Sequence, residues 1–167
     1  TSETMKNAQT AYDWMSGAVN EPSKQFVAVS TAVQKTDEFG ISRDHVFGFE
    51  DWVGGRYSLW GPIGLSIIIA LGAETFEALL NGAHEMDIHF KTAEIGKNLP
   101  ILLALIGVWH NQICNYSTRA ILPYDQRLNK LPTYLQQLEM ESNGKSVDLD
   151  GSLLDFHSAP VVWGEAG

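Results

Sequence analysis

The chain contains Asp51-Trp52-Val53-Gly54-Gly55-Arg56-Tyr57-Ser58, which follows a short apolar run and leads into the apolar stretch 59–64. Its two adjacent glycines can adopt backbone angles closed to other residues and let a ligand approach the main chain. Because Arg56 follows them at the entrance to an apolar helix, the stretch predicts an anion site. A tight turn in which Arg56 pairs with Asp51 would use the same residues, and Gly-Gly-Arg by itself leaves both interpretations open.

Short runs rich in β-branched residues alternate with segments of helical periodicity on both sides of this stretch. Such apolar runs are typical of buried strands in a parallel sheet, and their alternation with helices predicts an α/β fold. The predicted strands cover 26–30, 45–49, 119–123 and 161–163, and the predicted helices cover 1–16, 33–39, 59–71, 74–90, 99–114 and 127–143.

Some of these elements carry further expectations. The helices 59–71 and 99–114 are apolar nearly all round, so we expect both to be covered on several sides. The helix 74–90 has a single apolar face and should lie at the surface. Pro132 predicts a kink in the helix 127–143 or a later start of it. Around Asp150 and Gly151 the pattern is typical of a hairpin.

Length and composition indicate one globular domain. The 167 residues are 44% hydrophobic, enough to bury most of a core. A net charge of -9 without a run of basic residues argues against nucleic-acid binding. The single cysteine, Cys114, excludes an internal disulfide and favours a reducing cytoplasm. Because the sequence has no uninterrupted apolar run of about 18 residues, we expect no membrane span and a soluble protein.

The longer string from Asp51 to Gly64 resembles the signature of the phosphoglucose isomerases, which interconvert glucose 6-phosphate and fructose 6-phosphate in glycolysis and gluconeogenesis. Further stretches resemble landmarks of that family and occur in the family's order. They are Gly-Ala-His at 82–84, Ile-Leu-Pro-Tyr-Asp-Gln at 121–126, Met-Glu-Ser-Asn-Gly-Lys at 140–145 and Val-Trp-Gly-Glu at 162–165.

The resemblance implies a fold and a place within it. Phosphoglucose isomerases contain two sugar-isomerase (SIS) domains, each a three-layer αβα sandwich with a mostly parallel sheet. This chain resembles a central segment of such an enzyme. The implied division is the end of the first SIS domain at 1–72, connecting helices at 73–115 and the start of the second SIS domain at 116–167.

The resemblance also implies roles for particular residues. Moving a proton between C2 and C1 of the sugar through an enediol requires a base at the carbon and a positive group beside the developing oxyanion. The match at 140–145 implies that Glu141 is the base. The Gly-Gly-Arg match implies that Arg56 stabilises the enediolate and that Gly55 offers its backbone amide to the substrate.

Two more residues are implied in substrate binding. Gln137 lies four residues before Glu141, so on an α-helix both side chains project from one face. Thr1 resembles the last threonine of the family's phosphate-binding loop and precedes a helix whose N-terminus favours anions. Other parts of the family's site, including a histidine from the neighbouring subunit, match no residue of this chain, so we expect these 167 residues to form an incomplete site.

The remaining expectations concern partners and alternatives. The family works as a homodimer with a shared active site and needs no cofactor or metal. His84 and His89 are five residues apart and diverge on a helix, which argues against a metal site. A non-catalytic, sugar-phosphate-binding SIS module is the alternative from another class, and an inactive isolated fragment is a further one. The Gln137 and Glu141 pair favours the enzyme.

Overall fold

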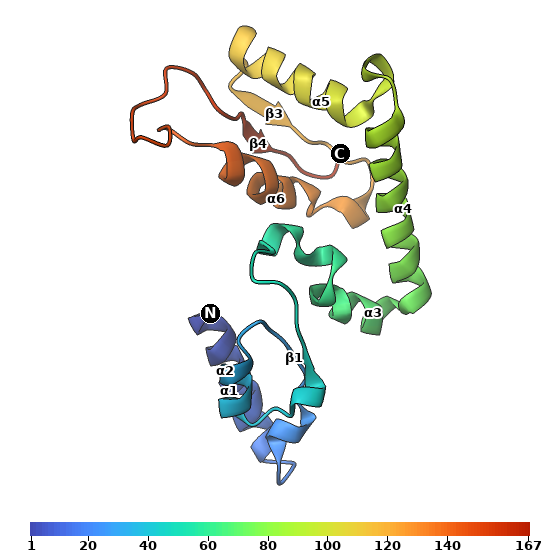
Figure 1. Ribbon diagram of the computed structural model, residues 1–167, viewed down its shortest axis with the longest axis vertical. Coiled ribbons are helices and arrows are strands. Elements are labelled where there is room, and N and C mark those ends of the chain that lie inside the picture. The colour runs from blue at the N-terminus through green and yellow to red at the C-terminus, as the bar shows by residue number, and fades with distance from the viewer. The chain divides into compact units, whose positions relative to one another are not determined.

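The computed structural model describes all of residues 1–167, which form two compact units, Thr1–Phe76 (unit 1) and Glu77–Gly167 (unit 2). Each unit contains one two-stranded parallel sheet (Figure 1). Unit 1 pairs β1 (Ala28–Val29) with β2 (Val46–Phe47), and unit 2 pairs β3 (Thr118–Ala120) with β4 (Val161–Trp163). The predicted α/β fold with parallel pairing is therefore confirmed, although most strands are shorter than predicted.

Unit 1 begins with α1 (Ser2–Ser16), a short 3-10 turn η1 (Pro22–Gln25), β1 and α2 (Val33–Phe39). A 3-10 turn η2 (Arg43–His45) then leads into β2. The helices predicted at 1–16 and 33–39 are confirmed. At the end of α2, Gly40 adopts a φ of 87°, a left-handed conformation that favours glycine and stops the helix.

The centre of unit 1 is a cluster of three aromatic rings. The Phe39 ring lies edge-on to the Tyr12 ring at 5.8 Å and to the Phe26 ring at 5.3 Å, measured between centroids. Ile41, which directly follows the Gly40 cap of α2, is also buried. The ring contacts join α1, α2 and the segment before β1.

The helix predicted at 59–71 is only partly correct. The segment forms two 3-10 helices, η3 (Gly55–Trp60) and η4 (Pro62–Gly64), and only α3 (Leu65–Leu71) is α-helical. Gly61 separates them with an extended backbone, and Pro62, whose ring fixes φ, opens the next turn. Gly64 is buried against the Phe76 ring, where an added Cβ would lie 2.6 Å from the ring carbons.

The long helix α4 (Ala73–Thr92) begins in unit 1 and continues in unit 2. Unit 2 then contains the 3-10 turn η5 (Ile95–Lys97) and α5 (Leu99–Val108), which passes into a π-helix, η6 (Trp109–Ile113). After β3, the chain forms the 3-10 turn η7 (Gln126–Leu128) and α6 (Leu131–Leu135). A second π-helix, η8 (Gln136–Glu141), follows α6 directly.

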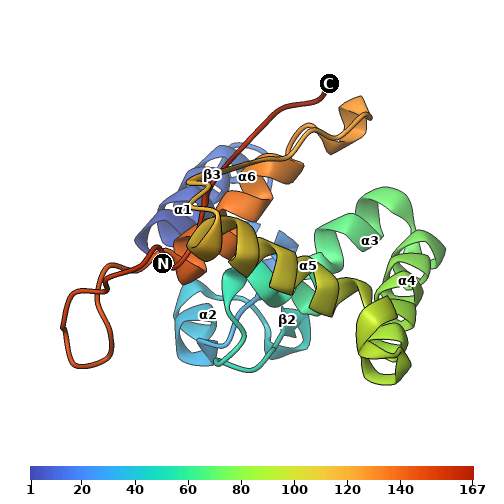
Figure 2. The ribbon, with the colours of Figure 1, turned by 90° about the horizontal axis from the view of Figure 1, so that it is seen from above.

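The order of layers in unit 2 is α5, the β3–β4 sheet and α6 (Figure 1). This order is consistent with the αβα arrangement of a sugar-isomerase fold. The segment from η8 to β4 extends away from the sheet as a loop (Figure 2), and its antiparallel bridge between Val147 and Leu153 confirms the predicted hairpin. Pro132 lies in the first turn of α6, so the predicted later start of the helix 127–143 is also confirmed.

A buried asparagine joins α4 to α5. Asn98 is fully buried; its Nδ2 donates to the Phe90 carbonyl at 2.8 Å and its Oδ1 accepts from the Ile101 amide at 3.2 Å. The Leu99 amide donates to His89 Nε2 at 3.0 Å. Asn98 therefore caps α5 and fixes the end of α4 at the same time.

The prediction that the chain buries most of a core is wrong, as is the prediction that its two most apolar helices are covered. The buried hydrophobic side chains are Ile41, Phe76 and Val162. On α5, Leu103 is 67% exposed and Leu105 is 56% exposed. The physical reason is that a two-stranded sheet offers little apolar surface for helices to pack against. The amphipathic helix α4 lies at the surface, as expected.

None of the helices is long and apolar enough to cross a membrane. The division into 1–72, 73–115 and 116–167 stays a prediction.

Replacing Asn98 by alanine should destabilise unit 2. The change removes the α5 cap and leaves the Phe90 carbonyl without its buried donor, so we expect the free energy of unfolding to fall by about 1–3 kcal/mol. Chemical denaturation of the variant measures this, with the exposed Asn129→Ala as the matched control. Equal stability of the two variants would contradict the role assigned to Asn98.

The ion pair between Arg43 and Asp37 predicts a dependence on pH. Arg43 Nη2 lies 2.8 Å from Asp37 Oδ2, and this hydrogen bond, followed by the charge of Arg43, holds the pKa of the Asp37 carboxyl below its ordinary value. A depressed pKa in the folded state means that the contact stabilises above the ordinary Asp pKa and that this contribution is lost as the pH falls through the folded pKa.

Arg43→Met should therefore raise the pKa of Asp37 toward its ordinary value. The stability difference from the unmodified protein should shrink as the pH is lowered through that range. An NMR titration of the Asp37 carboxyl carbon measures the shift directly, and an unchanged titration curve would count against the contact.

Candidate functional site

The Gly-Gly-Arg stretch opens the 3-10 helix η3 in unit 1. The Tyr57 amide donates to the Gly54 carbonyl at 3.0 Å, and the buried Ser58 hydroxyl donates to the Gly55 carbonyl at 2.6 Å. A Cβ built on Gly55 would have no atom within 4 Å, so the main chain there is open to an approaching group. Arg56 is half-buried beside it.

One part of the sequence interpretation needs correction. Gly55 does not stand at the entrance to the apolar α-helix, because α3 begins only at Leu65, after two 3-10 helices. A short 3-10 helix has little of the aligned dipole that attracts anions to an α-helix N-terminus. The anion binding predicted for this loop would therefore rely on the Arg56 charge and on the open backbone at Gly55.

Thr1 caps the first helix of unit 1. Its Oγ1 accepts from the Thr4 amide at 3.2 Å. In the same turn, the Glu3 backbone amide donates a hydrogen bond to the Glu3 carboxyl and so lowers the pKa of that carboxyl. A hydrogen bond from the Thr1 hydroxyl lowers this pKa further. The first turn of α1 thus favours negative charge, as expected for a helix N-terminus.

Thr1 also lines a cavity of about 260 Å³ between α1, β1 and α2. Lys35 and Ser30 line it as well, while Gly55 and Arg56 do not. Within unit 1 the structure therefore brings Gly55 and Arg56 together in η3 and places Thr1 on a separate element.

Gln137 and Glu141 lie on the π-helix η8 in unit 2, and both are exposed. The prediction that they share the face of an α-helix is wrong in its geometry, because η8 bonds residue i to residue i+5 and has a wider turn. Residues four apart nevertheless remain close to one turn apart, so the two side chains still project from neighbouring positions. π-helical turns occur frequently at functional sites.

The end of η8 is held by the residues that follow Glu141. The Gly144 amide donates to the Met140 carbonyl at 2.7 Å, and Lys145 Nζ donates to the Glu141 carbonyl at 2.9 Å. The Ser158 hydroxyl bonds both the amide and the carbonyl of Lys145 at 2.9 Å. The backbone that carries Glu141 is therefore fixed while its carboxylate stays accessible.

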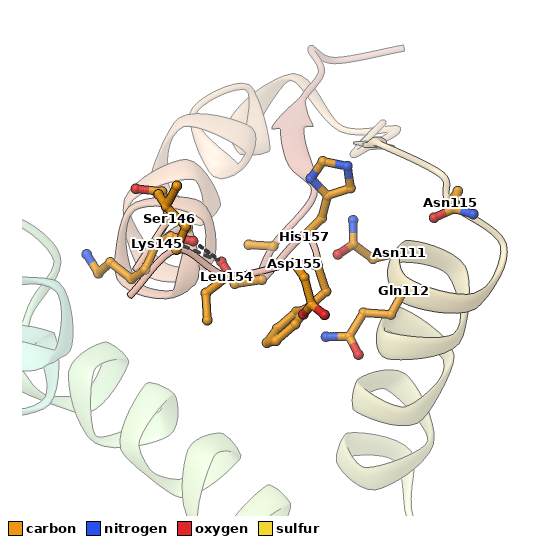
Figure 3. A pocket seen from close by; sticks show the side chains of 13 residues that line it. Asn111, Gln112, Asn115, Lys145, Ser146, Leu154, Asp155 and His157 are labelled. Carbon is orange, nitrogen blue, oxygen red and sulfur yellow. Dashed lines mark hydrogen bonds between the residues drawn. The ribbon is translucent and has the colours of Figure 1, made fainter. Parts of the chain in front are cut away.

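A cavity of unit 2 lies beside this helix end. It has a volume of about 700 Å³ and is lined by Asn111, Gln112, Asn115 and the loop residues 144–146 and 153–159 (Figure 3). Asp155 and His157 face Asn111 and Gln112 across it (Figure 3). None of the five residues predicted from the sequence lines this cavity.

Sequence reasoning missed one ion pair in unit 2. Arg119 on β3 contacts Glu139 on η8, and these residues are twenty positions apart with no shared motif. Only the sheet register and the position of η8 bring them together, so no local pattern could have indicated the pair.

The structure gathers no group of three or more His, Cys, Asp or Glu side chains that could hold a metal ion.

Comparison with known proteins gives matches along the whole chain. Residues 1–167 match the sequence model of the family described as phosphoglucose isomerase. The glucose-6-phosphate isomerase of Cereibacter sphaeroides strain ATCC 17025 is 64% identical over 167 residues, which are 100% of this chain and 31% of that relative. The glucose-6-phosphate isomerase of Ruegeria pomeroyi gives the same identity and coverage, and that of Roseobacter denitrificans is 60% identical over 100% of this chain and 32% of its own.

A solved structure agrees. The crystal structure of a glucose-6-phosphate isomerase from Chlamydia trachomatis matches with a TM-score of 0.68 and 34% identity, covering 80% of this chain and 30% of that one. The chain thus spans about a third of the length of the curated relatives it matches.

Gly144→Ala should disturb the turn that fixes Glu141. A Cβ at Gly144 would collide with the Met140 carbonyl oxygen, a backbone atom that can move only with η8. We expect the free energy of unfolding to fall by about 1–3 kcal/mol, as for other overpacked sites. Chemical denaturation of the variant measures this change. Gly96→Ala is the control, because a Cβ at Gly96 would meet no atom within 4 Å. A Gly144→Ala variant as stable as the control would contradict the clash.

Proposed function

Since the chain belongs to the phosphoglucose isomerase family, we propose that it carries catalytic residues of a glucose-6-phosphate isomerase. The reaction converts glucose 6-phosphate and fructose 6-phosphate into each other through an enediol. The observation that carries the proposal is the end of η8, where an anchored backbone presents the exposed Glu141 carboxylate with Gln137 nearby.

Glu141 is the base that moves the proton. Its carboxylate takes the proton from C2 of the aldose, and the electron pair of the C–H bond forms the C1–C2 double bond of the enediol. The π electrons of the C1 carbonyl move onto O1, which receives the proton that leaves the C2 hydroxyl. The C2 carbonyl then forms as the double bond takes the proton back from Glu141 at C1, which gives the ketose with no net proton gained or lost. The exposure of Glu141 supports this role, because a sugar can reach the carboxylate.

Arg56 stabilises the negative charge of the enediolate. A guanidinium cannot lose its proton at neutral pH, so it offers a fixed positive charge to the developing oxyanion. The open space at Gly55 supports a second contact, a hydrogen bond from its backbone amide to the sugar. Proton transfer through an enediol needs no electron carrier, and these groups supply its chemistry without a metal or other cofactor.

Gln137 and Thr1 bind the substrate. The Gln137 amide, one turn before Glu141, contacts a sugar hydroxyl. Thr1 contributes to binding of the phosphate at the N-terminus of α1, where the first backbone amides of the helix favour anions. The complete protein works as a homodimer with a shared active site in the cytoplasm, where a reducing environment suits its single cysteine.

Replacing Glu141 by glutamine in the complete protein should abolish isomerisation while leaving sugar-phosphate binding intact. Removal of a general base lowers kcat by about 10²- to 10⁴-fold, and the amide keeps the shape of the side chain. A coupled assay of fructose 6-phosphate conversion measures kcat, and calorimetric titration measures binding. The exposed Glu94→Gln serves as control. Retained turnover in Glu141→Gln would refute the assignment of the base.

Arg56→Met should lower kcat by about 10²- to 10³-fold, the effect of losing one group that stabilises an oxyanion. Arg56→Lys keeps the charge and should recover part of the rate. The exposed Arg43→Met, in the same unit, should leave kcat unchanged. Equal rates for the methionine and lysine variants of Arg56 would show that its charge is not used. An unmodified protein that binds the sugar phosphate without converting it would instead favour the non-catalytic SIS module.

A further inference from the structure

We propose that Arg119 is a positioning residue for the isomerase reaction. Through its ion pair with Glu139 it fixes the π-helix η8 on the sheet, and so it determines where the Glu141 carboxylate lies. The inference rests on the proposed function, because it takes Glu141 as the base.

The ion pair is close and partly shielded from water. Arg119 Nη1 donates to both carboxylate oxygens of Glu139, at 2.6 Å to Oε1 and 2.8 Å to Oε2. The two side chains are 27% and 29% exposed, whereas the side chains of the Lys97–Glu94 pair in the same unit are 77% and 79% exposed. Partial burial reduces screening by solvent, so the Arg119 contact restrains its partners more strongly than a surface pair does.

Two side chains of η8 are attached to the same rung of the sheet. Arg119 on β3 is the direct register partner of Val162 on β4. Gln136 Nε2 donates to the Val162 carbonyl at 2.9 Å, and Glu139 bonds Arg119. Val162 is 1% exposed, so close packing restrains this residue pair.

The contact of Glu139 with Arg119 extends the attachment of η8 to the sheet beyond its first residue. Gln136 is the first residue of η8 and lies five residues before Glu141, whereas Glu139 lies only two residues before it. The ion pair of Glu139 thus adds an attachment to the sheet between the Gln136 contact and the Lys145 contact that follows Glu141, and it is the one nearer in sequence to Glu141 on the sheet side. A shift of about 1 Å at a reacting group can cost 100-fold in rate.

A glycine on α5 makes room for the guanidinium. A Cβ built on Gly107 would lie 2.5 Å from Arg119 Nη2, so the guanidinium passes directly over the backbone of α5. Arg119 is therefore held between α5 and η8, and its position is set from both sides.

The test uses the complete protein with Arg119→Met and Glu139→Gln, separately and together, and measures kcat and KM for fructose 6-phosphate. We expect each single variant to lower kcat about 10-fold or more, with a smaller change in KM, because the base lies on η8 whereas most of the proposed binding groups (Thr1, Gly55 and Arg56) do not. The double variant should lose no more than the worse single one, since both act through one contact. Arg119→Lys should recover part of the rate.

The control is Lys97→Met, which breaks the exposed pair with Glu94 and should leave kcat unchanged. A purely structural ion pair would lower the unfolding temperature without lowering kcat, and that result in Arg119→Met or Glu139→Gln would overturn the proposal. Independent, additive losses in the double variant would overturn it too. If Arg119→Met does not fold, Glu139→Gln, which keeps the size of the side chain, decides alone.

Failure of the proposed function gives a different result. Retained turnover in Glu141→Gln removes the base assignment and this inference with it. An inactive Glu141→Gln beside a fully active Arg119→Met removes only the inference.

Discussion

The parallel pairing of β3 with β4 is the constraint on which the second unit depends. It buries Val162 at the centre and turns the Val162 carbonyl toward Gln136, while the register partner of Val162, Arg119, faces Glu139. One rung of a short sheet thus receives two side chains of the π-helix that ends at Glu141. The parallel pairing brings Arg119 and Val162 together although they are far apart in the sequence. A parallel pair requires a long crossover connection, and η8 is part of that connection.

In both units a segment that carries predicted site residues lies next to a small sheet, and neither unit buries much apolar surface. In unit 1 the strands are two residues long, and the chain leaves β2 directly toward the Gly-Gly-Arg loop. Local hydrogen bonds such as that of the Ser58 hydroxyl to Gly55 and that of the Tyr57 amide to Gly54 hold that loop in shape. Helices as apolar as α5 therefore remain largely exposed on the unit, and the sites are stabilised by polar contacts more than by a core.

The sequence allowed some elements to be predicted closely, and the physical reasons are local. The helix 33–39 ends at Gly40 because only glycine readily adopts the left-handed cap, and the strand 161–163 is a β-branched apolar run. The π-helix could not be predicted, because a stripe of leucines at 128, 131, 135 and 138 fits an α-helix and a wider turn almost equally well. The exposure of α5 could not be predicted either, because burial depends on which surfaces a helix finds. The site residues came from family resemblance and stay predictions, whereas the Arg119–Glu139 contact needed the sheet register.

The space above Gly107 ties three positions of the family to one another. A side chain at 107 would push the flexible guanidinium of Arg119 aside, and Glu139 would then lose its counterion. Natural variation at 107, 119 and 139 should therefore be correlated. A relative that carries a larger residue at 107 would need a shorter side chain at 119, and with it a different partner at 139. These three positions are thus expected to change as a set over evolutionary time, although only 119 and 139 share a charge interaction.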